Sequence, residues 1–295
     1  MREFEGRTAV VTGAASGMGL AFAERFARDG MNVVLADVEL AALRVAAARV
    51  EADPRAGGVL AVPTDVGSAV EMDHLGEAAL EAFGAAHVVC LNAGVAGGGG
   101  PMENLTTGDW KWALDVNLWG VIHGIRVFLK GLKAQDEGHI VVTSSVAGLT
   151  SYPGLGPYNA SKHAVASIAE TLYAELAEAG SRVGVSCLCP GRVATRIHES
   201  ERNRPKPLAD EERPARDFLD PGQRAAAAGL FAAGQPPAEV AERVFAAIVE
   251  ERFWIYTDGA FREPIRARHR SIENESEPPA RGPILEPYLR AESAD

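Results

Sequence analysis

Through its first 260 residues or so, the chain alternates short apolar runs with longer segments of helical periodicity. The apolar runs are residues 8–12, 31–37, 59–62, 86–91, 139–145, 182–189 and 253–257. The helical segments between them are residues 20–28, 39–52, 68–83, 107–134, 158–179 and 237–251. Strands joined by helices pair in parallel through right-handed crossovers. The alternation therefore predicts an α/β fold, a doubly wound parallel sheet with helices on both faces.

Size and charge restrict the class of protein. The 295 residues are 47% apolar, which is enough for a large core. Acidic residues outnumber basic ones, the net charge is −11, and no block of five like charges occurs. Nucleic acid and anionic membrane surfaces are therefore unsuitable partners.

The cysteines and the N-terminal segment predict a location. Cys90, Cys187 and Cys189 lie inside apolar runs, where cysteines pack as small core residues, so we expect neither a disulfide framework nor a metal site. No apolar stretch approaches the roughly 18 residues of a membrane span. Residues 1–6 lead directly into a strand and leave no room for a signal peptide. We expect a cytoplasmic protein.

A glycine-rich turn joins the first strand to the first helix. Its candidate ligand-binding residues are Gly13, Ser16, Gly17, Met18 and Gly19. Glycines let backbone N–H groups approach a pyrophosphate at the positive end of a helix, which is the basis of a dinucleotide site. Such a turn also occurs as a simple connection.

Asp37 ends the second strand, 24 residues after Gly13. This spacing suits a carboxylate that accepts hydrogen bonds from the adenosine ribose. The same carboxylate would repel a 2′-phosphate, and neither Ala36, Val38 nor Ser16 supplies a cation. The sequence therefore favours NAD over NADP, although a solvated aspartate at a strand end is the alternative.

Tyr158 and Lys162 are four residues apart at the start of a predicted helix, so they share one helix face. A free phenol has a pKa of about 10, and a nearby ammonium favours the phenolate. The pair predicts an acid/base group whose pKa is lowered by Lys162. Chance also produces such pairs, so the rest of the chain must support the assignment.

Two further polar residues have unusual positions. Ser145 follows a strand at its carboxyl end, where parallel sheets bind ligands. Asn117 lies in an apolar helical segment, so its amide must bond either to the local backbone or to a functional network.

These features occur in one order: Thr12-Gly-x-x-x-Gly-x-Gly19, Asp37, Asp65, Asn92-Ala-Gly94, Asn117, Ser145, Tyr158-x-x-x-Lys162 and Pro190-Gly-x-Val-x-Thr195. In this combination the chain resembles the short-chain dehydrogenase/reductase family over roughly residues 5 to 260. The resemblance implies a single Rossmann-type domain that binds NAD. One departure is Leu91, where many members have a second asparagine before Asn92.

The resemblance also assigns roles. It implies that Asp65 and Val66 lie near the adenine, Asn92, Ala93 and Gly94 along the cofactor, and Val193 and Thr195 at the nicotinamide carboxamide. Residue chemistry and resemblance together imply that Ser145 holds the substrate oxygen and that Tyr158 takes or gives the proton of that oxygen. They also imply that Lys162 binds the nicotinamide ribose. The resemblance places a water on Asn117 and implies a homotetramer or homodimer built through the helices containing Asn117 and Tyr158.

The expected organisation is a catalytic domain over residues 1–262, with a substrate lid at 192–237, followed by an arm or tail over 263–295. Three segments resemble a branch that includes dehydrogenases acting on the benzylic alcohol of lignin-derived aryl ethers: Ile197-His-Glu-Ser, Asn203-Arg-Pro205 and Thr257-Asp-Gly-Ala-Phe-Arg-Glu263. We therefore expect a secondary alcohol or ketone as substrate, hydrophobic or aryl in character.

Two other functions fit parts of the pattern. A non-catalytic NAD-binding sensor or scaffold would be expected to lose Ser145, Tyr158 or Lys162, and all three are present. An epimerase or dehydratase of the same fold would use the dinucleotide without net oxidation or reduction. In the lid, His198 is either a packing residue or a substrate contact. Outside the lid, Trp110 and Trp112 are expected in the core or a subunit interface rather than in a substrate wall.

Overall fold

The computed structural model describes residues 1, 3–208, 228–282 and 284. Within this part of the chain, seven parallel strands form one sheet with the order β3-β2-β1-β4-β5-β6-β7. The strands are β1 (Thr8–Thr12), β2 (Asn32–Asp37), β3 (Val59–Pro63), β4 (Val88–Leu91), β5 (Gly138–Thr143), β6 (Val183–Cys189) and β7 (Trp254–Tyr256). The order reverses direction between β1 and β4, so a crevice opens beyond their carboxyl ends. The predicted doubly wound parallel fold is confirmed.

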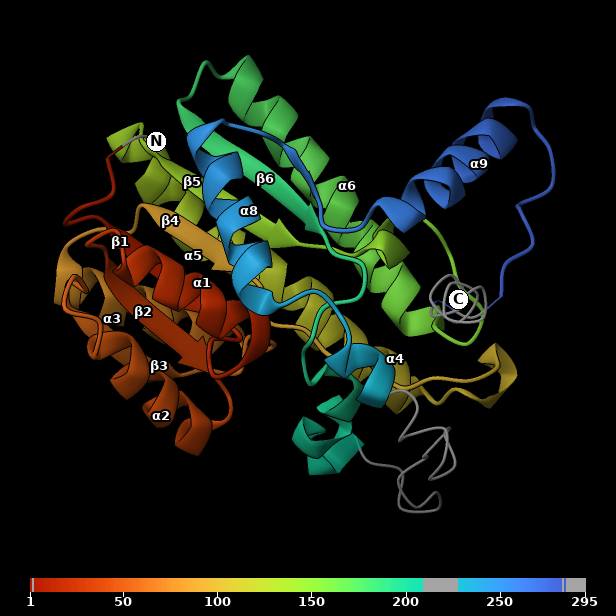
Figure 1. The fold of residues 1–295 in the computed structure, drawn as a ribbon, viewed down its shortest axis with the longest axis horizontal. Helices are drawn as coiled ribbons and strands as arrows, with labels where there is room; N and C mark the ends of the chain where they lie inside the picture. Colours follow the sequence, from red (N-terminus) through yellow and green to blue (C-terminus); the bar gives the residue numbers. More distant parts are fainter. Residues whose placement is uncertain (2, 209–227, 283, 285–295) are drawn as a thin grey trace.

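Helices cover both faces of the sheet (Figure 1). The helices are α1 (Gly17–Ala27), α2 (Leu40–Glu51), α3 (Ala69–Phe83), α4 (Thr107–Leu114), α5 (Gly120–Gln135), α6 (Gly156–Glu178), α8 (Pro237–Val249) and α9 (Arg262–Glu273). Successive strand residues point to opposite faces, as Ala9 and Val11 join one core cluster and Val10 the other. The first cluster packs under α1, α2 and α8, and the second under α3, α5 and α6.

The predicted helix over 107–134 is interrupted. α4 ends at Leu114, a π-helical turn covers Asp115–Trp119, and α5 begins at Gly120. Asn117 lies in the middle of this turn with no exposed surface. A π turn widens the helix and displaces side chains from their α-helical positions, and such turns are frequent at functional sites.

The lid begins as two 3₁₀ segments, Ile197–Asn203 (η4) and Lys206–Leu208 (η5). Residues 209–227 of the predicted lid lie outside the described residues, as do 283 and 285–295 of the arm. The described part of the arm contains α9, which projects away from the sheet (Figure 1).

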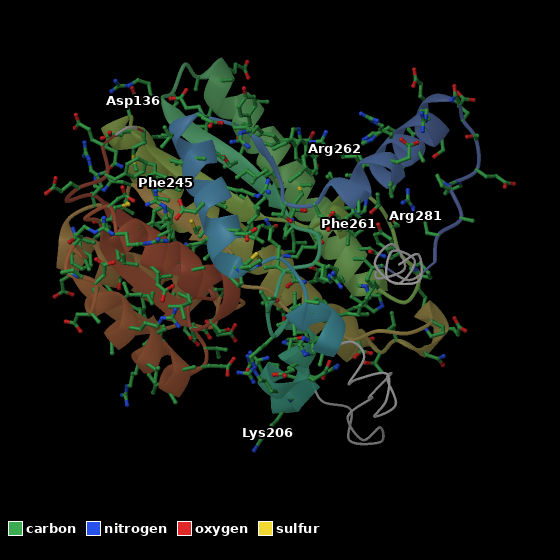
Figure 2. The ribbon with its side chains drawn as sticks, viewed as in Figure 1. Asp136, Lys206, Phe245, Phe261, Arg262 and Arg281 are labelled. Carbon is green, nitrogen blue, oxygen red and sulfur yellow. The ribbon has the colours of Figure 1, made fainter. Side chains whose placement is uncertain are left out.

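The arm is nevertheless attached to the domain. Phe261 and Arg281, before and after α9 in the chain, lie close to each other (Figure 2). Both contact Tyr152, Phe261 through an edge-on ring contact with centroids 6.3 Å apart and Arg281 with its guanidinium 5.8 Å from the ring centroid. Helices of the described residues are all too short or too polar to cross a membrane.

Candidate active site

A cavity of about 930 Å³ opens at the carboxyl ends of the strands. It is lined by most of the residues predicted from the sequence: Gly13, Ser16, Gly17, Met18, Asp37, Asp65, Val66, Asn92, Ala93, Gly94, Ser145, Tyr158, Lys162, Val193 and Thr195. Gly19 and Asn117 are buried and do not line the cavity. Residues separated by more than a hundred positions in the sequence are thus gathered at one edge of the sheet.

The glycine turn forms a close-packed floor for this cavity. α1 begins at Gly17, directly after the turn, so its N-terminal amides face the cavity. A Cβ at Gly19 would overlap the carbonyl of Gly13, so only glycine allows the helix to pack this near the turn. The Asp37 carboxylate braces the same turn, because its Oδ2 accepts a 3.0 Å hydrogen bond from the Ala15 N–H.

Thr12 joins the ends of β1 and β4. Its hydroxyl accepts hydrogen bonds from the backbone N–H groups of Asn92 and Ala93 at 2.9 and 3.1 Å, and the Asn92 side chain donates to the Thr12 carbonyl at 3.0 Å. These bonds hold the chain after β4 beside the glycine turn, so both segments border the same crevice.

Asn117 makes three buried hydrogen bonds. Its Oδ1 accepts from the Val95 N–H at 2.8 Å, and its Nδ2 donates to the Val95 carbonyl at 3.0 Å and to the Ser161 hydroxyl at 3.1 Å. The amide therefore connects the loop after β4 to α6. Of the two sequence-based alternatives, bonding to the local backbone is not observed, because the partners Val95 and Ser161 are 22 and 44 residues away in the chain.

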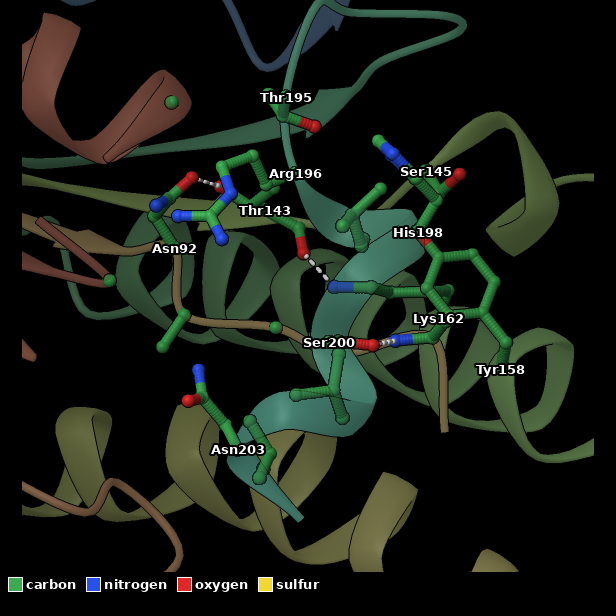
Figure 3. A pocket seen from close by; sticks show the side chains of 18 of the residues that line it. Asn92, Thr143, Ser145, Tyr158, Lys162, Thr195, Arg196, His198, Ser200 and Asn203 are labelled. Carbon is green, nitrogen blue, oxygen red and sulfur yellow. Dashed lines mark hydrogen bonds between the residues drawn. The ribbon is translucent and has the colours of Figure 1, made fainter. Parts of the chain in front are cut away.

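Lys162 lies next to this network. A Cβ placed on Gly94 would be 3.3 Å from Asn117 Oδ1 and 3.4 Å from Lys162 Nζ, so both groups crowd the same glycine. The Lys162 ammonium donates a 2.8 Å hydrogen bond to the Thr143 carbonyl at the end of β5 (Figure 3). The Lys162 side chain is 3% exposed, so its charge is almost entirely removed from water.

Tyr158 and Ser145 both line the cavity. The Ser145 hydroxyl accepts a hydrogen bond from the Ala147 N–H at 3.1 Å, and it is close enough to the Tyr158 phenol to affect the pKa of that phenol. The backbone of Ser145 is extended, with φ −170° and ψ 166°, and its side chain caps the short turn that follows β5. The hydroxyl and the phenol are therefore positioned to share one substrate oxygen.

Burial determines the electrostatics of the pair. It raises the pKa of the Tyr158 phenol, and the nearby Ser145 hydroxyl opposes that rise. It also lowers the pKa of Lys162 to about 8, against a smaller opposite effect from the nearby Cys187 and Cys189 thiols. The Tyr–Lys spacing predicted a lowered pKa for Tyr158, whereas burial raises that pKa in the folded protein. Desolvation disfavours the phenolate, and the ammonium lies 5.8 Å from the centre of the ring.

Two residues in the described part of the predicted lid contact the domain beside the cavity. The Ser200 hydroxyl accepts a 3.0 Å hydrogen bond from the Ala96 N–H. Arg204 forms a 2.7 Å ion pair with Asp109, whose carboxylate also caps α4 through Thr106. The ion pair is poorly hydrated, because the two side chains are 13% and 7% exposed.

Several cavity residues were not indicated by the sequence. Phe231 belongs to the predicted lid and stacks on His198 with ring centroids 5.0 Å apart, Phe261 directly precedes α9, and Ile284 comes from the predicted arm. Trp112, expected in the core or a subunit interface, is 1% exposed and also lines the cavity. Phe261 lies within the segment Thr257–Glu263 that carries the branch resemblance. No motif marks Phe231 or Ile284, since an apolar side chain in a polar segment is a common surface feature.

The family was identified by comparison with known proteins. The short chain dehydrogenase family model matches residues 7–206. The chain belongs to the short chain dehydrogenase family. This short chain dehydrogenase is 30% identical to the CLA biosynthesis dehydrogenase/reductase of Lactiplantibacillus plantarum over 282 residues, which are 94% of this chain and 97% of that protein. The family predicted from the ordered motifs is thereby confirmed.

Two solved structures extend the likeness to the fold. A short chain dehydrogenase/reductase from Burkholderia phymatum, solved in complex with NAD, is 45% identical with a TM-score of 0.88 and covers 95% of this chain and 99% of its own. LigO from Sphingobium sp. strain SYK-6 is 28% identical with a TM-score of 0.76 over 93% of this chain and 90% of its own. The protein is therefore an oxidoreductase of the dehydrogenase or reductase type.

Proposed function

We propose that this short chain dehydrogenase oxidises a hydrophobic or aryl secondary alcohol, or reduces the corresponding ketone, with NAD(H) as its redox partner. The observation that carries the proposal is the meeting of Ser145, Tyr158 and Lys162 in one cavity with a glycine turn and the Asp37 carboxylate. A sensor or scaffold has no need for a phenol, a serine hydroxyl and a buried ammonium gathered beside a dinucleotide-type glycine turn.

The cavity fits a dinucleotide. The N-terminal amides of α1 would hold the pyrophosphate, Asp37 the adenosine ribose, and Val193 and Thr195 the nicotinamide carboxamide. Asp65 and Val66 would border the adenine, while Asn92, Ala93 and Gly94 would run along the cofactor. When bound, NAD(H) supplies the hydride transfer to or from the substrate carbon. The NAD complex of the Burkholderia relative supports the preference for NAD.

The residues of the chain would handle the proton and orient the substrate. In the direction of ketone reduction, the protonated Tyr158 phenol donates to the ketone oxygen while Ser145 holds that oxygen. In the direction of alcohol oxidation, Tyr158 accepts the alcohol proton, and the positive charge of Lys162 would act against the burial that disfavours the phenolate. Lys162 would also bind the nicotinamide ribose. Asn117 would fix Lys162 and the Val95 loop and hold the water that links Lys162 to solvent.

The walls of the cavity support a hydrophobic substrate. Away from the proposed cofactor contacts, the cavity is lined by Trp112, Leu155, Phe231, Phe261 and Ile284. His198 stacks on Phe231 and adds a flat surface with one polar edge. Together with the resemblance of the lid to dehydrogenases of lignin-derived aryl ethers, these walls favour an aryl group beside the reacting carbon.

The decisive experiment is Tyr158→Phe. We expect turnover of every alcohol accepted by the wild type to fall at least about a thousandfold, because proton transfer is lost, while NADH binding changes little. Tyr256→Phe is the matched control, since that phenol lies in β7 and does not line the cavity. Full turnover by Tyr158→Phe would refute the assignment.

A panel of aryl alcohols and small polyols tests the substrate class. Formation of NADH, followed by absorbance, should be greatest with aryl secondary alcohols. Equal or greater turnover of small polyols would overturn the substrate proposal. Product formation without any net change in NADH would instead indicate an epimerase or dehydratase.

We further propose that the enzyme is a cytoplasmic homotetramer or homodimer that assembles through the helices α5 and α6. Trp119, just before α5, and Tyr173 on α6 are 48% and 50% exposed, and large exposed aromatic residues are typical of interfaces. Light scattering on the purified protein tests this, and a monomer at micromolar concentration would contradict it.

A further inference from the structure

The end of the lid nearest the glycine turn is tied to the segment after β2 by a cluster of charged and polar side chains. One oxygen of the Glu39 carboxylate, Oε1, accepts hydrogen bonds from Arg202 Nε at 3.1 Å, from Arg202 Nη2 at 2.6 Å and from Asn203 Nδ2 at 2.9 Å. The Arg202 and Glu39 side chains are 27% and 26% exposed, so water screens the pair only in part.

This cluster lies beside the acid that is proposed to bind the adenosine ribose. The Glu39 N–H donates a 3.0 Å hydrogen bond to Asp37 Oδ1, so the two acids belong to one tight turn after β2. Asp37, Glu39, Arg202 and Asn203 all line the same cavity. Asn203 is seen on the cavity side of the lid in Figure 3.

The Arg202 guanidinium has anchors besides Glu39. Its Nη1 donates to the carbonyl of Arg196 at 3.2 Å and to that of Glu199 at 3.0 Å. These bonds fix the guanidinium to the 3₁₀ turn of the lid that contains it. Loss of the negative charge on Glu39 would therefore leave the cation at the cavity rather than release it to solvent.

We propose that Glu39 and Arg202 form a cofactor-selection pair, in which the Glu39 carboxylate neutralises a guanidinium that would otherwise bind the 2′-phosphate of NADP. The proposal deepens the proposed function, since it rests on a dinucleotide whose adenosine ribose lies at Asp37. From the sequence, NAD is favoured because no cation adjoins Asp37. In the folded protein the guanidinium of Arg202, 163 residues further along the chain than Glu39, bonds to Glu39 beside Asp37. Selection against NADP then depends on Glu39 as well as on Asp37.

The physical reason lies in the charges that a 2′-phosphate would meet. Arginine binds phosphate through paired N–H donors, and the same donors of Arg202 are occupied by a carboxylate. A phosphate approaching this pair would meet the negative charges of Asp37 and Glu39 beside the positive charge of Arg202. The neighbouring Arg196, whose charge also acts on Glu39, is itself paired with Glu199 at 2.6 Å. In Glu39→Gln the amide oxygen keeps an acceptor for Arg202 and Asn203, but one negative charge is gone, so the guanidinium can face the phosphate.

The test measures binding of NADPH and NADH to the whole protein by fluorescence titration, without any substrate. For Glu39→Gln we expect the Kd of NADPH to fall about tenfold and that of NADH to change less than about threefold. The gain should shrink at high salt, because it comes from partly exposed charges. The double variant Glu39→Gln/Arg202→Gln should lose the gain.

Glu103→Gln is the matched control, because it removes one negative charge from an exposed position outside the cavity. It should leave both dissociation constants unchanged. The proposal is overturned if Glu39→Gln leaves the NADPH:NADH ratio unchanged, or if the double variant keeps the gain. A purely structural role for the cluster would weaken both dinucleotides equally in Glu39→Gln, which also overturns it.

Failure of the proposed function has a different outcome. If the wild type binds neither NADH nor NADPH, the dinucleotide site itself is refuted, and the selection proposal with it. If the wild type binds NADH but Tyr158→Phe keeps full turnover, the assignment of the proton donor fails. The proposal for Glu39 and Arg202 is then still decided by the NADH and NADPH titrations, which do not depend on turnover.

Discussion

The buried ammonium of Lys162 should make the stability of the protein rise with pH in a defined range. Burial lowers the pKa of Lys162 from 10.5 to about 8. Between these two values the unfolded chain holds a proton on this group that the folded chain has lost, so the free energy of unfolding increases with pH. Below pH 8 both states are protonated and the full cost of burying the charge is present. Above pH 10.5 both are neutral and the cost is gone.

The size of the effect follows from the two pKa values. Each unit of difference corresponds to about 1.4 kcal/mol, so burial of the charge costs on the order of 3 kcal/mol at pH 7. At pH 9.5 roughly two-fifths of this cost remains. The contribution of Lys162 to the free energy of unfolding should therefore rise by about 2 kcal/mol between pH 7 and pH 9.5.

Lys162→Met isolates this contribution from all other titrating groups. Methionine fills a similar volume without charge, so the variant should lack the rise. Urea unfolding at pH 7 and pH 9.5, without added dinucleotide, gives the free energy of unfolding of each protein. The difference between wild type and variant should shift by about 2 kcal/mol in favour of the wild type at the higher pH.

A control removes an ammonium that is in water. Lys130 is exposed on α5, and Lys130→Met should follow the wild-type dependence on pH because water solvates that charge in both states. The reasoning is refuted if the wild type and Lys162→Met differ by the same free energy at both pH values. That result would mean that Lys162 reaches water in the folded protein.

Two substitutions test the buried networks by urea unfolding. Asn117→Ala should lower the free energy of unfolding by about 3 kcal/mol, because the Val95 N–H and C=O groups lose buried partners. Asn32→Ala, at an exposed amide, should cost under about 1 kcal/mol, and equal losses would contradict the argument. Asp109→Ala should cost about 2 kcal/mol, because the poorly hydrated Arg204 loses its 2.7 Å partner and keeps only the longer, 3.5 Å ion pair with Glu201. Adding Arg204→Met should restore part of that loss, and a further full loss would contradict the ion-pair explanation.

The alternation of strands and helices was sufficient to predict the sheet. β-strand periodicity, helix periodicity and turn residues are local properties, and each of the seven strands occurs where the sequence indicated a strand. Chirality then allows few ways to connect parallel strands. Tyr158 and Lys162 were predicted to share a helix face for the same local reason, and both line the cavity. The residue roles assigned to that pair stay predictions.

The sequence did not indicate the break in the helix around Asn117. A run of apolar residues has nearly the same pattern whether one turn is α-helical or π-helical, so periodicity gave one helix over 107–134. The structure replaces its centre with a π turn, which lets Asn117 reach Val95, 22 residues away, and Ser161, 44 residues away. The direction of the Tyr158 pKa was also decided by burial, which sequence spacing does not report.

By itself, then, the sequence determined the parallel α/β sheet, the dinucleotide-type glycine turn and the order of the polar residues at the strand ends, because these follow from local spacing. Only the tertiary structure decided which distant groups meet. It brought Arg202 to Glu39 across 163 residues, Phe261 and Ile284 to the cavity, and Lys162 into an almost anhydrous position. Such contacts depend on how loops and arms pack against a finished sheet. No local pattern in the chain encodes that packing.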